Sequence, residues 1–230
     1  MSSFLYTKPC PRCRKLGNDR SGNNLAHYSD GHTYCFACGF KTKGDVIERI
    51  KSQVKETNTE TYTKSNIIPN NALVWLKKYG LTDAEIYDNF FWDDNGYLVF
   101  DGKTYQCGRN FNSYGAKYKT KGVIKGNEVV FVPENNCSDT IVIVEDHVSA
   151  IKVSRVCASV ALSTATISLG LLARLSNQFK HAVIWLDPDK QKESVREAEK
   201  AKSFFDSVKV VWSDKDPKEH TVNEIQELLK

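Results

Sequence analysis

Four of the seven cysteines form two C-x2-C pairs, and no other feature of the sequence restricts its fold as strongly. The pairs are Cys10/Cys13 in "PCPRC" and Cys35/Cys38 in "SDGHTYCFACGF", with 21 residues between them. Two such pairs present four thiolates in the tetrahedral arrangement that Zn²⁺ prefers in closed structural sites. The spacing therefore predicts a zinc ribbon, in which the metal supplies folding energy that a segment of about 40 residues cannot obtain from its small core.

The other cysteines and the apolar residues indicate where the protein works. An odd number of cysteines, four of them in metal-type pairs, favours a reducing compartment over a disulfide framework. Cys107, Cys137 and Cys157 are most simply small buried residues. No apolar run approaches the roughly 20 residues needed to span a bilayer, and "MSSFLYTKPC" lacks the pattern of a secretory signal. We therefore expect a cytoplasmic protein with no membrane partner.

Positive charge is concentrated in two segments, although the formal net charge is only +4. Residues 1–44 contain seven basic and two acidic side chains. Residues 101–127 contain one acidic side chain and six basic ones, namely Lys103, Arg109, Lys117, Lys119, Lys121 and Lys125. Two basic segments in a nearly neutral chain indicate a polyanionic partner, although solvated lysines alone would give the same counts.

The order of patterns along the chain predicts an α/β protein of several parts. A zinc ribbon with a small β fold occupies residues 1–44, and the polar stretch 45–66 reads as a flexible linker. Residues 67–137 predict a basic α+β subdomain with two short helices, the second opened by a Thr82–Glu85 capping box, followed by β-hairpins. Residues 138–230 alternate near-continuous apolar strands with helices, which is typical of a parallel sheet covered on both faces.

Acidic residues follow two of these predicted strands. "IVIVED" ends on Glu145 and Asp146, and "VIWLDPD" carries Asp187 and Asp189. The carboxyl ends of parallel strands line one edge of the sheet, so carboxylates from two strands can meet there and hold Mg²⁺ or Mn²⁺. The alternative interpretation is that each acid caps the helix that follows it.

Two further groups of polar residues are candidates for binding. In "SDKDPKE", Asp214 and Asp216 can extend the acidic cluster and Lys215 can meet a phosphate, although the same string is also a good turn. Around the cysteines, cations that can meet phosphate and rings that can stack on bases suit single-stranded nucleic acid, and these residues include Arg12, His32 and Tyr34. A histidine near a zinc ribbon is also a common polar filler.

Taken together, the motifs resemble those of the phage-type DNA primases, the primase half of phage primase–helicase proteins, and more distantly bacterial DnaG. "CPRC…SDGHTYCFAC" is similar to their zinc-binding domain, and "YQCGRNF…AKYKTKG" is similar to their basic RNA-polymerase subdomain. "IVIVED…VIWLDPD…KDP" resembles the TOPRIM fold that they share with topoisomerases. The resemblance covers nearly the whole chain in the same order.

The resemblance implies a template-directed enzyme that makes short RNA primers on single-stranded DNA from ribonucleoside triphosphates. It makes Glu145, Asp187 and Asp189 the principal magnesium ligands, with Asp146 and Asp216 as further contributors. It places Arg109 and Lys117 against nucleotide phosphates or template, with Lys119, Lys121 and Lys215 as further phosphate-binding candidates. His32 becomes a template contact through the shared SDGHT run.

Two departures from the family pattern qualify this expectation. The usual first TOPRIM motif is E-G-x-x-D, whereas residues 145–149 here read Glu-Asp-His-Val-Ser, so that Ser149 stands where the second acid is expected. In addition, the G-x-x-x-x-G-K-[ST] motif of a motor domain does not occur, which predicts a separate replicative helicase as a partner. The alternatives are a non-catalytic DNA-binding module similar to the RecR recombination mediators, and a TOPRIM nuclease.

Overall fold

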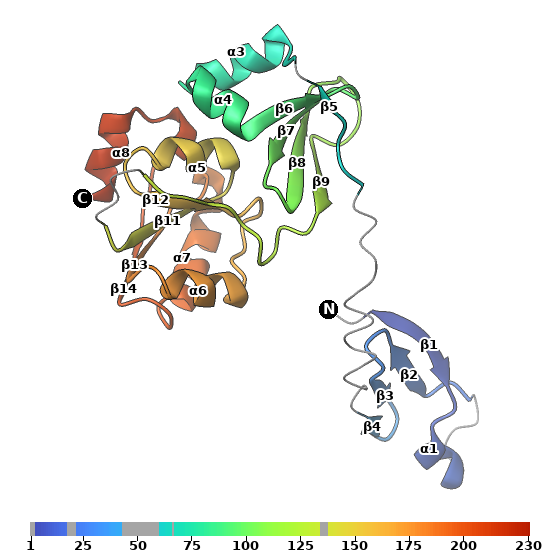
Figure 1. Ribbon diagram of the computed structural model, residues 1–230. Coiled ribbons are helices and arrows are strands. Elements are labelled where there is room, and N and C mark those ends of the chain that lie inside the picture. Colours follow the sequence, from blue (N-terminus) through green and yellow to red (C-terminus); the bar gives the residue numbers. More distant parts are fainter. Residues whose placement is uncertain (1–2, 18–21, 43–59, 66, 134–137) are drawn as a thin grey trace. The chain divides into compact units, whose positions relative to one another are not determined.

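The computed structural model describes residues 3–17, 22–42, 60–65, 67–133 and 138–230. They belong to two compact units, Met1–Thr59 and Glu60–Lys230 (Figure 1). Most of the predicted linker, residues 45–66, lies outside the described residues, as does Cys137.

The described end of that linker, residues 60–65, is folded into the second unit. Tyr62 is buried, and its ring lies 5.5 Å from that of Tyr97. The short strand β5 (Lys64–Ser65) then pairs with β6 (Phe90–Asp93). The folded unit therefore begins before residue 67, because one aromatic ring in an otherwise polar stretch buries against the sheet.

The first unit is a small antiparallel sheet with one short helix. The strand order is β1-β2-β3-β4, and the elements are β1 (Phe4–Lys8), α1 (Pro11–Lys15), β2 (Leu25–Tyr28), β3 (Thr33–Cys35) and β4 (Lys41–Thr42). Apart from the cysteines, its described buried hydrophobic residues are Leu25 and Ala26, and every residue of β1 is exposed. This small β fold confirms the predicted ribbon, and its core is too small to stabilise it without additional bonds.

The second unit opens with two helices and a five-stranded antiparallel sheet. The order is β5-β6-β7-β8-β9, and the further elements are α3 (Asn70–Lys78), α4 (Asp83–Asn89), β7 (Tyr97–Asp101), β8 (Tyr105–Asn110) and β9 (Tyr118–Gly122). The predicted capping box of α4 is present, with Thr82 and Glu85 each accepting from the other's backbone N–H. Gly96 has a φ of +87° at the tight turn between β6 and β7, which explains the glycine there.

The second sheet of this unit is parallel except at one edge. Its order is β10-β12-β11-β13-β14, built from β10 (Val130–Phe131), β11 (Thr140–Val144), β12 (Ala158–Ala161), β13 (His181–Ile184) and β14 (Ser207–Val210). β10 pairs antiparallel with β12, and it comes from the segment predicted as the basic subdomain. Strands β12, β11, β13 and β14 are parallel, as the sequence predicts, and β11 lies in the middle.

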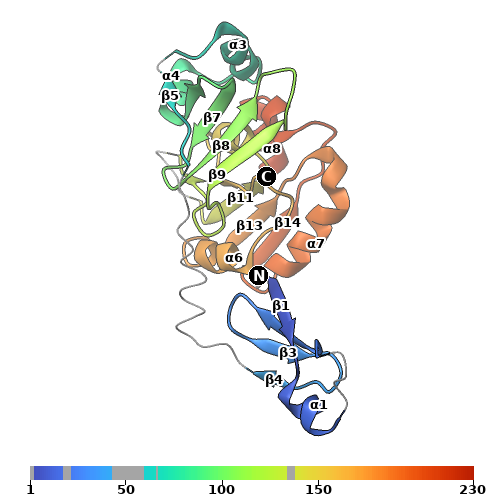
Figure 2. The same ribbon diagram turned by 90° about the vertical axis from the view of Figure 1, so that its right-hand side faces the viewer.

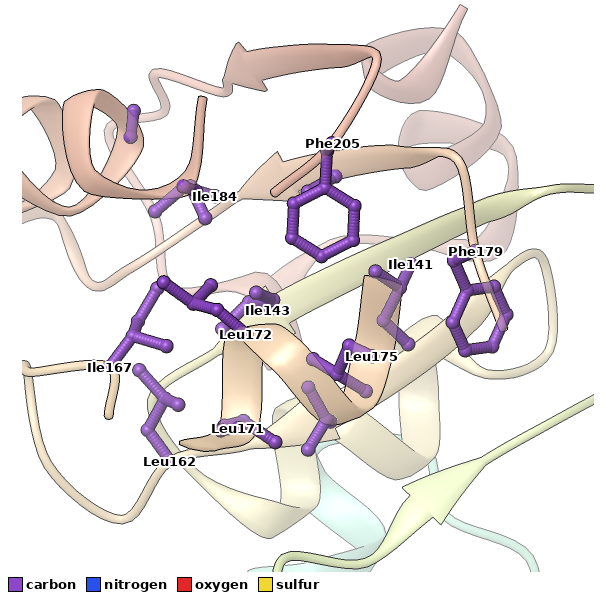
Figure 3. Close-up of a cluster of buried hydrophobic side chains, with 14 of the residues drawn as sticks. Ile141, Ile143, Leu162, Ile167, Leu171, Leu172, Leu175, Phe179, Ile184 and Phe205 are labelled. Atoms are coloured by element: carbon purple, nitrogen blue, oxygen red, sulfur yellow. The ribbon is translucent and has the colours of Figure 1, made fainter. Parts of the chain in front are cut away.

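Helices cover both faces of this parallel sheet. Ile141 and Ile143 of β11 pack with α6 (Leu169–Ser176) and α7 (Gln191–Ala201) in the cluster drawn in Figure 3. Val142 and Val144 point to the other face, toward α5 (His147–Val153) and α8 (Val222–Leu229). Because alternate residues of a strand face opposite sides, a strand buried on both faces needs an unbroken apolar run.

The two sheets of the second unit share a hydrophobic core through α5. Val148 and Ile151 of this helix pack with Leu98 and Phe100 of β7. In Figure 2, strands β7, β8 and β9 lie beside the parallel strands β11, β13 and β14. The edge at which the parallel strands end therefore lies against the antiparallel sheet. Among the described residues, no helix combines the length and the apolar character that crossing a bilayer requires.

Candidate functional site

The four predicted cysteines come together in the first unit. Cys10 precedes α1 and Cys13 lies within it, whereas Cys35 ends β3 and Cys38 lies in the next turn. Their sulfur atoms all lie within 4.8 Å of one another. The Sγ–Sγ distances are 3.7 Å for Cys10–Cys38 and 3.6 Å for Cys13–Cys35.

These distances fit a zinc ion. Four sulfurs at about 2.3 Å from a tetrahedral ion lie about 3.8 Å apart. Burial raises the pKa of the Cys35 thiol, but backbone N–H groups of Cys38 and Ala37 donate hydrogen bonds that outweigh burial and bring the pKa to about 7. The lowered pKa favours the thiolate at Cys35, whereas a hydrogen bond with Cys38 and burial raise the pKa of Cys13, so that zinc binding there would have to displace the thiol proton.

The predicted nucleic-acid contacts of the ribbon lie near paired aromatic rings. The His32 ring stacks on Tyr28 at 4.2 Å, and its Nδ1 pairs with the Asp30 carboxylate, which fixes the orientation of the imidazole. Tyr34 is partly exposed and meets the exposed Phe36 edge-on at 5.2 Å. Arg12 is exposed on α1.

Sequence reasoning missed two members of this surface, Tyr6 and Asp30. The Tyr6 ring stacks on the ring of His27, with the centroids 4.8 Å apart. Asp30, two residues before His32, is visible in the sequence as the acid of the SDGHT run, but only the structure shows that it holds the ring.

In the second unit, the ends of the parallel strands open into a cavity of about 400 Å³. Glu145 follows β11 directly and Asp187 lies three residues after β13. Both line the cavity, together with Asp146 and Asp216. The structure thus brings four of the predicted acids to one cavity at this edge of the sheet. Asp189 does not line the cavity: its side chain is 71% exposed and pairs with Lys190 at 2.8 Å.

Two carboxylate oxygens in this cavity are buried and have no hydrogen-bond partner among the described residues, namely Oε2 of Glu145 and Oδ1 of Asp187. Burial raises the pKa of Asp187 to about 7, and the charges of Asp216 and Glu145 add to the effect against the opposing Lys218. Burial also raises the pKa of Glu145. A buried anion without a partner is costly, so both oxygens fit the role of ligands to a cation.

The fit to magnesium therefore rests on these two oxygens rather than on a tight cluster. The ligand atoms of the four cysteines all lie within 4.8 Å of one another. Among the described residues, no three of the cavity acids bring their oxygens this close together. A hydrated Mg²⁺ tolerates such spacing, since it commonly keeps several waters and binds through one or two carboxylates.

Asp146 does not point a vacant carboxylate into the cavity. It caps α5: Oδ1 accepts from the backbone N–H of Ser149 at 3.0 Å, and Oδ2 accepts from the Ser149 hydroxyl at 2.8 Å. The Nζ of Lys218 also donates to Oδ2, at 2.9 Å. Burial raises the pKa of Asp146, but Lys218 and the Ser149 hydrogen bonds outweigh burial and leave it below the usual range. Ser149 itself is fully buried and directs its hydroxyl to Asp146.

The cation of this turn is Lys218 rather than the predicted Lys215. Lys215 is exposed and lies 3.9 Å from Glu224. Lys218 lies within η2 (Pro217–Glu219), is 12% exposed, and also donates to Asp216, at 2.6 Å. Lys215 and Lys218 stand on either side of the Asp-Pro pair in "KDPKE", so the sequence does not distinguish them. The conformation of the turn brings Lys218, and not Lys215, to the cavity.

A basic wall faces the acids across the cavity. Arg109 of β8 lies 4.3 Å above the Trp75 ring and donates to the Tyr118 hydroxyl at 2.6 Å. Lys117 and Lys119 also line the cavity. Lys121 does not: its Nζ donates to the Thr61 carbonyl at 2.9 Å and lies over the Tyr62 ring. Sequence reasoning missed the two aromatic supports of Arg109. Trp75 comes from α3 and belongs to no motif, and Tyr118 of β9 lies within the basic string 116–122, which does not show that its hydroxyl meets Arg109.

Comparison with known proteins supports the fold. No protein-family model matches the sequence, and no curated protein matches it. The crystal structure of the Aquifex aeolicus primase, comprising zinc-binding and RNA polymerase domains, matches with a TM-score of 0.54 and 15% identity over 100% of this chain and 79% of that one. The primase fragment of the bacteriophage T7 primase-helicase protein matches with a TM-score of 0.44 and 19% identity, over 99% and 98% of the two chains. The first of these matches shows that the chain shares the fold of a primase's zinc-binding and RNA polymerase domains, as the motifs predicted.

Proposed function

We propose that this protein is a DNA primase that synthesises short RNA primers on single-stranded DNA by magnesium-dependent nucleotidyl transfer. The observation that carries the proposal is the cavity, in which two unpartnered buried carboxylate oxygens, on Glu145 and Asp187, face the basic wall of Arg109, Lys117 and Lys119. The primase fold supports it.

The chemistry joins the 3′-hydroxyl of one nucleotide to the α-phosphate of the next and releases pyrophosphate. Glu145 and Asp187 are the residues that would hold Mg²⁺. Asp189, predicted as a third principal ligand, does not line the cavity, and Asp216, predicted as a contributor, is paired with Lys218. A divalent ion bound there would neutralise phosphate charge and lower the pKa of the attacking hydroxyl.

The basic wall provides the complementary contacts. The Arg109 guanidinium is held by Trp75 and Tyr118, so it meets a triphosphate or template phosphate as a fixed cation that requires little reorganisation. Lys117 and Lys119 add two more positive charges at the same cavity. In the ribbon, His32 and Tyr34 offer ring faces and Arg12 a charge to single-stranded template. Lys121 and Lys215 face away from the cavity and are assigned no phosphate.

The test is a primer-synthesis assay with single-stranded templates, ribonucleotides and Mg²⁺. We expect short, template-dependent RNA from the wild type and a loss of about 100-fold or more from Asp187→Asn. Asp206→Asn is the matched control, because Asp206 is an exposed acid just before β14, at the opposite end of the sheet. Equal synthesis by Asp187→Asn and wild type would contradict the proposed site.

One observation favours a different function, that of a non-catalytic DNA binder. Two of the four cavity acids form ion pairs with Lys218, and Ser149 stands where the second acid of the first TOPRIM motif is expected. The same assay separates the functions, since a binder retains template without product and a nuclease shortens it. A panel of templates would then identify the recognised sequence, and addition of a replicative helicase would test the predicted partner.

A further inference from the structure

The side chain of Lys218 places a positive charge among the acids of the cavity. Its Nζ lies 2.9 Å from Oδ2 of Asp146 and 2.6 Å from Oδ2 of Asp216, and its side chain is 12% exposed. The two acids reach it from different elements, since Asp146 caps α5 and Asp216 precedes η2. An ammonium with two carboxylate partners at these distances is a firmly held ion pair rather than a mobile surface charge.

The turn that carries Lys218 is fixed independently of this ion pair. Its backbone carbonyl accepts from the Nζ of the buried Lys152 at 2.9 Å, which ties η2 to α5. Asp216 and Glu219 form a capping box around Pro217. The ammonium also lies 5.7 Å from the centroid of the Tyr79 ring. These contacts give Lys218 a defined position on the cavity wall.

Lys218 divides the four cavity acids into two pairs. Asp146 and Asp216 already share a cation, whereas Glu145 and Asp187 each keep a buried oxygen without a partner among the described residues. We infer that the Lys218 ammonium replaces a divalent cation between Asp146 and Asp216, so that the cavity takes one divalent ion, at Glu145 and Asp187. This inference rests on the magnesium site of the proposed function.

Simple electrostatics supports the exclusion of a second ion. A divalent ion between Asp146 and Asp216 would approach their oxygens to about 2.1 Å, where the ammonium already stands and repels it. Ser149 is consistent with this arrangement, because it sets a neutral hydroxyl, not an acid, against Asp146. Fewer negative charges and one fixed positive charge leave the cavity with less attraction for a second ion.

The experiment counts Mn²⁺ ions bound to the full, zinc-loaded chain by electron paramagnetic resonance. We expect one Mn²⁺ per chain for the wild type and two for Lys218→Met, which keeps the side-chain length but removes the charge. Lys218→Arg keeps the positive charge and is expected to bind one Mn²⁺ per chain, as the wild type does. Lys215→Met, at the exposed lysine of the same turn, is the control that stays at one.

Several results would overturn the inference. These are two ions in the wild type, one ion in a folded Lys218→Met, or no ion in the wild type. If Lys218→Met does not fold, the wild type and Lys218→Arg decide, since two ions in either contradict the inference and one ion in both supports it. Primer synthesis by a wild type that binds two ions would retain the proposed function and reject the inference. One bound ion in the wild type and two in Lys218→Met, without primer synthesis by the wild type, would support the inference and reject the proposed function.

Discussion

The cysteine cluster of the ribbon and the proposed magnesium site of the cavity are built in opposite ways. In the ribbon, the four cysteines are themselves a large part of the buried interior, with little apolar core around them. In the cavity, the acids stand at the edge of a sheet that already has an apolar core on each face, one of which is drawn in Figure 3. The comparison teaches that a metal in the ribbon would be a component of the fold, whereas the proposed ion of the cavity would bind to a fold that does not depend on it.

The largest expected effect of this difference is on removal of zinc. Replacing Cys13 and Cys35 with serine, or adding a strong chelator, is expected to unfold residues of the first unit and to leave the second unit folded, because only the first depends on metal for its free energy of folding. Nuclear magnetic resonance of the amide groups measures both units in one sample. Dispersed amide signals from β1–β4 in the absence of zinc would show that the first unit folds without the metal, and would contradict this difference between the two units.

The next prediction concerns an ion pair that stabilises the second unit independently of zinc. Arg155 donates to both carboxylate oxygens of Glu85, at 2.7 and 2.5 Å, and thereby joins α4 to the end of α5. We expect Glu85→Gln to lower the free energy of unfolding of this unit by about 2 kcal/mol at pH 7, between the values of exposed and buried ion pairs. The glutamine carbonyl can keep the Thr82 cap and one bond from Arg155, so the change removes the charge and the second acceptor together.

The loss from Glu85→Gln is also expected to depend on pH. Burial raises the pKa of Glu85, but Arg155 and Thr82 outweigh burial and leave it below its usual value of 4.5. A carboxyl with a depressed folded-state pKa stabilises the protein above its unfolded-state pKa, and this contribution disappears as the pH falls through the folded-state value. Denaturation curves of wild type and variant should therefore converge as the pH falls below 4.5. A constant difference would assign the loss to packing.

A smaller effect sharpens the distinction between the basic residues. Arg109→Ala is expected to raise the KM for ribonucleotides by about tenfold, the loss of one charge-assisted hydrogen bond to phosphate. Lys121→Ala is the control and should leave KM unchanged, because its ammonium is directed to Thr61 and Tyr62. Equal effects of the two variants would mean that charge density alone, not position in the cavity, determines binding.

The smallest effect concerns a single helix cap. The Thr221 hydroxyl accepts from the backbone N–H of Glu224 at the start of α8. Thr221→Ala should lower the free energy of unfolding of the second unit by about 1 kcal/mol. Zinc content should not change. A loss of zinc in this variant would show that the two units depend on each other.

Much of this architecture was predictable because the relevant interactions are local or repetitive. The cysteine spacing predicts its own cluster, and the apolar runs around Ile143 and Val183 predict strands buried on both faces. The predicted capping box at Thr82 was confirmed because both partners lie within four residues, and the box at Thr221 is local in the same way. The edge strand β10 was not predicted, since two residues carry no periodicity.

The candidate site was harder to predict because it depends on side-chain direction. The sequence placed Glu145 and Asp187 correctly at one edge, yet it did not show that Asp189 turns toward Lys190 and solvent. Lys215 and Lys218 are equivalent in composition, and the turn at Pro217 decides which of them enters the cavity. Long-range contacts, such as that of Arg109 with Trp75, leave no local pattern at all.

His147 and α5 determine how the cavity can move. The His147 ring stacks on Phe100 at 3.7 Å and shares a hydrogen bond of 3.0 Å with the Tyr105 hydroxyl. Both contacts cross from the parallel sheet to the antiparallel one, and Val148 and Ile151 continue them as shared core. These contacts tie the two walls of the cavity together. Under the proposed function, we therefore expect the nucleic acid, and not the cavity walls, to move between successive nucleotide additions.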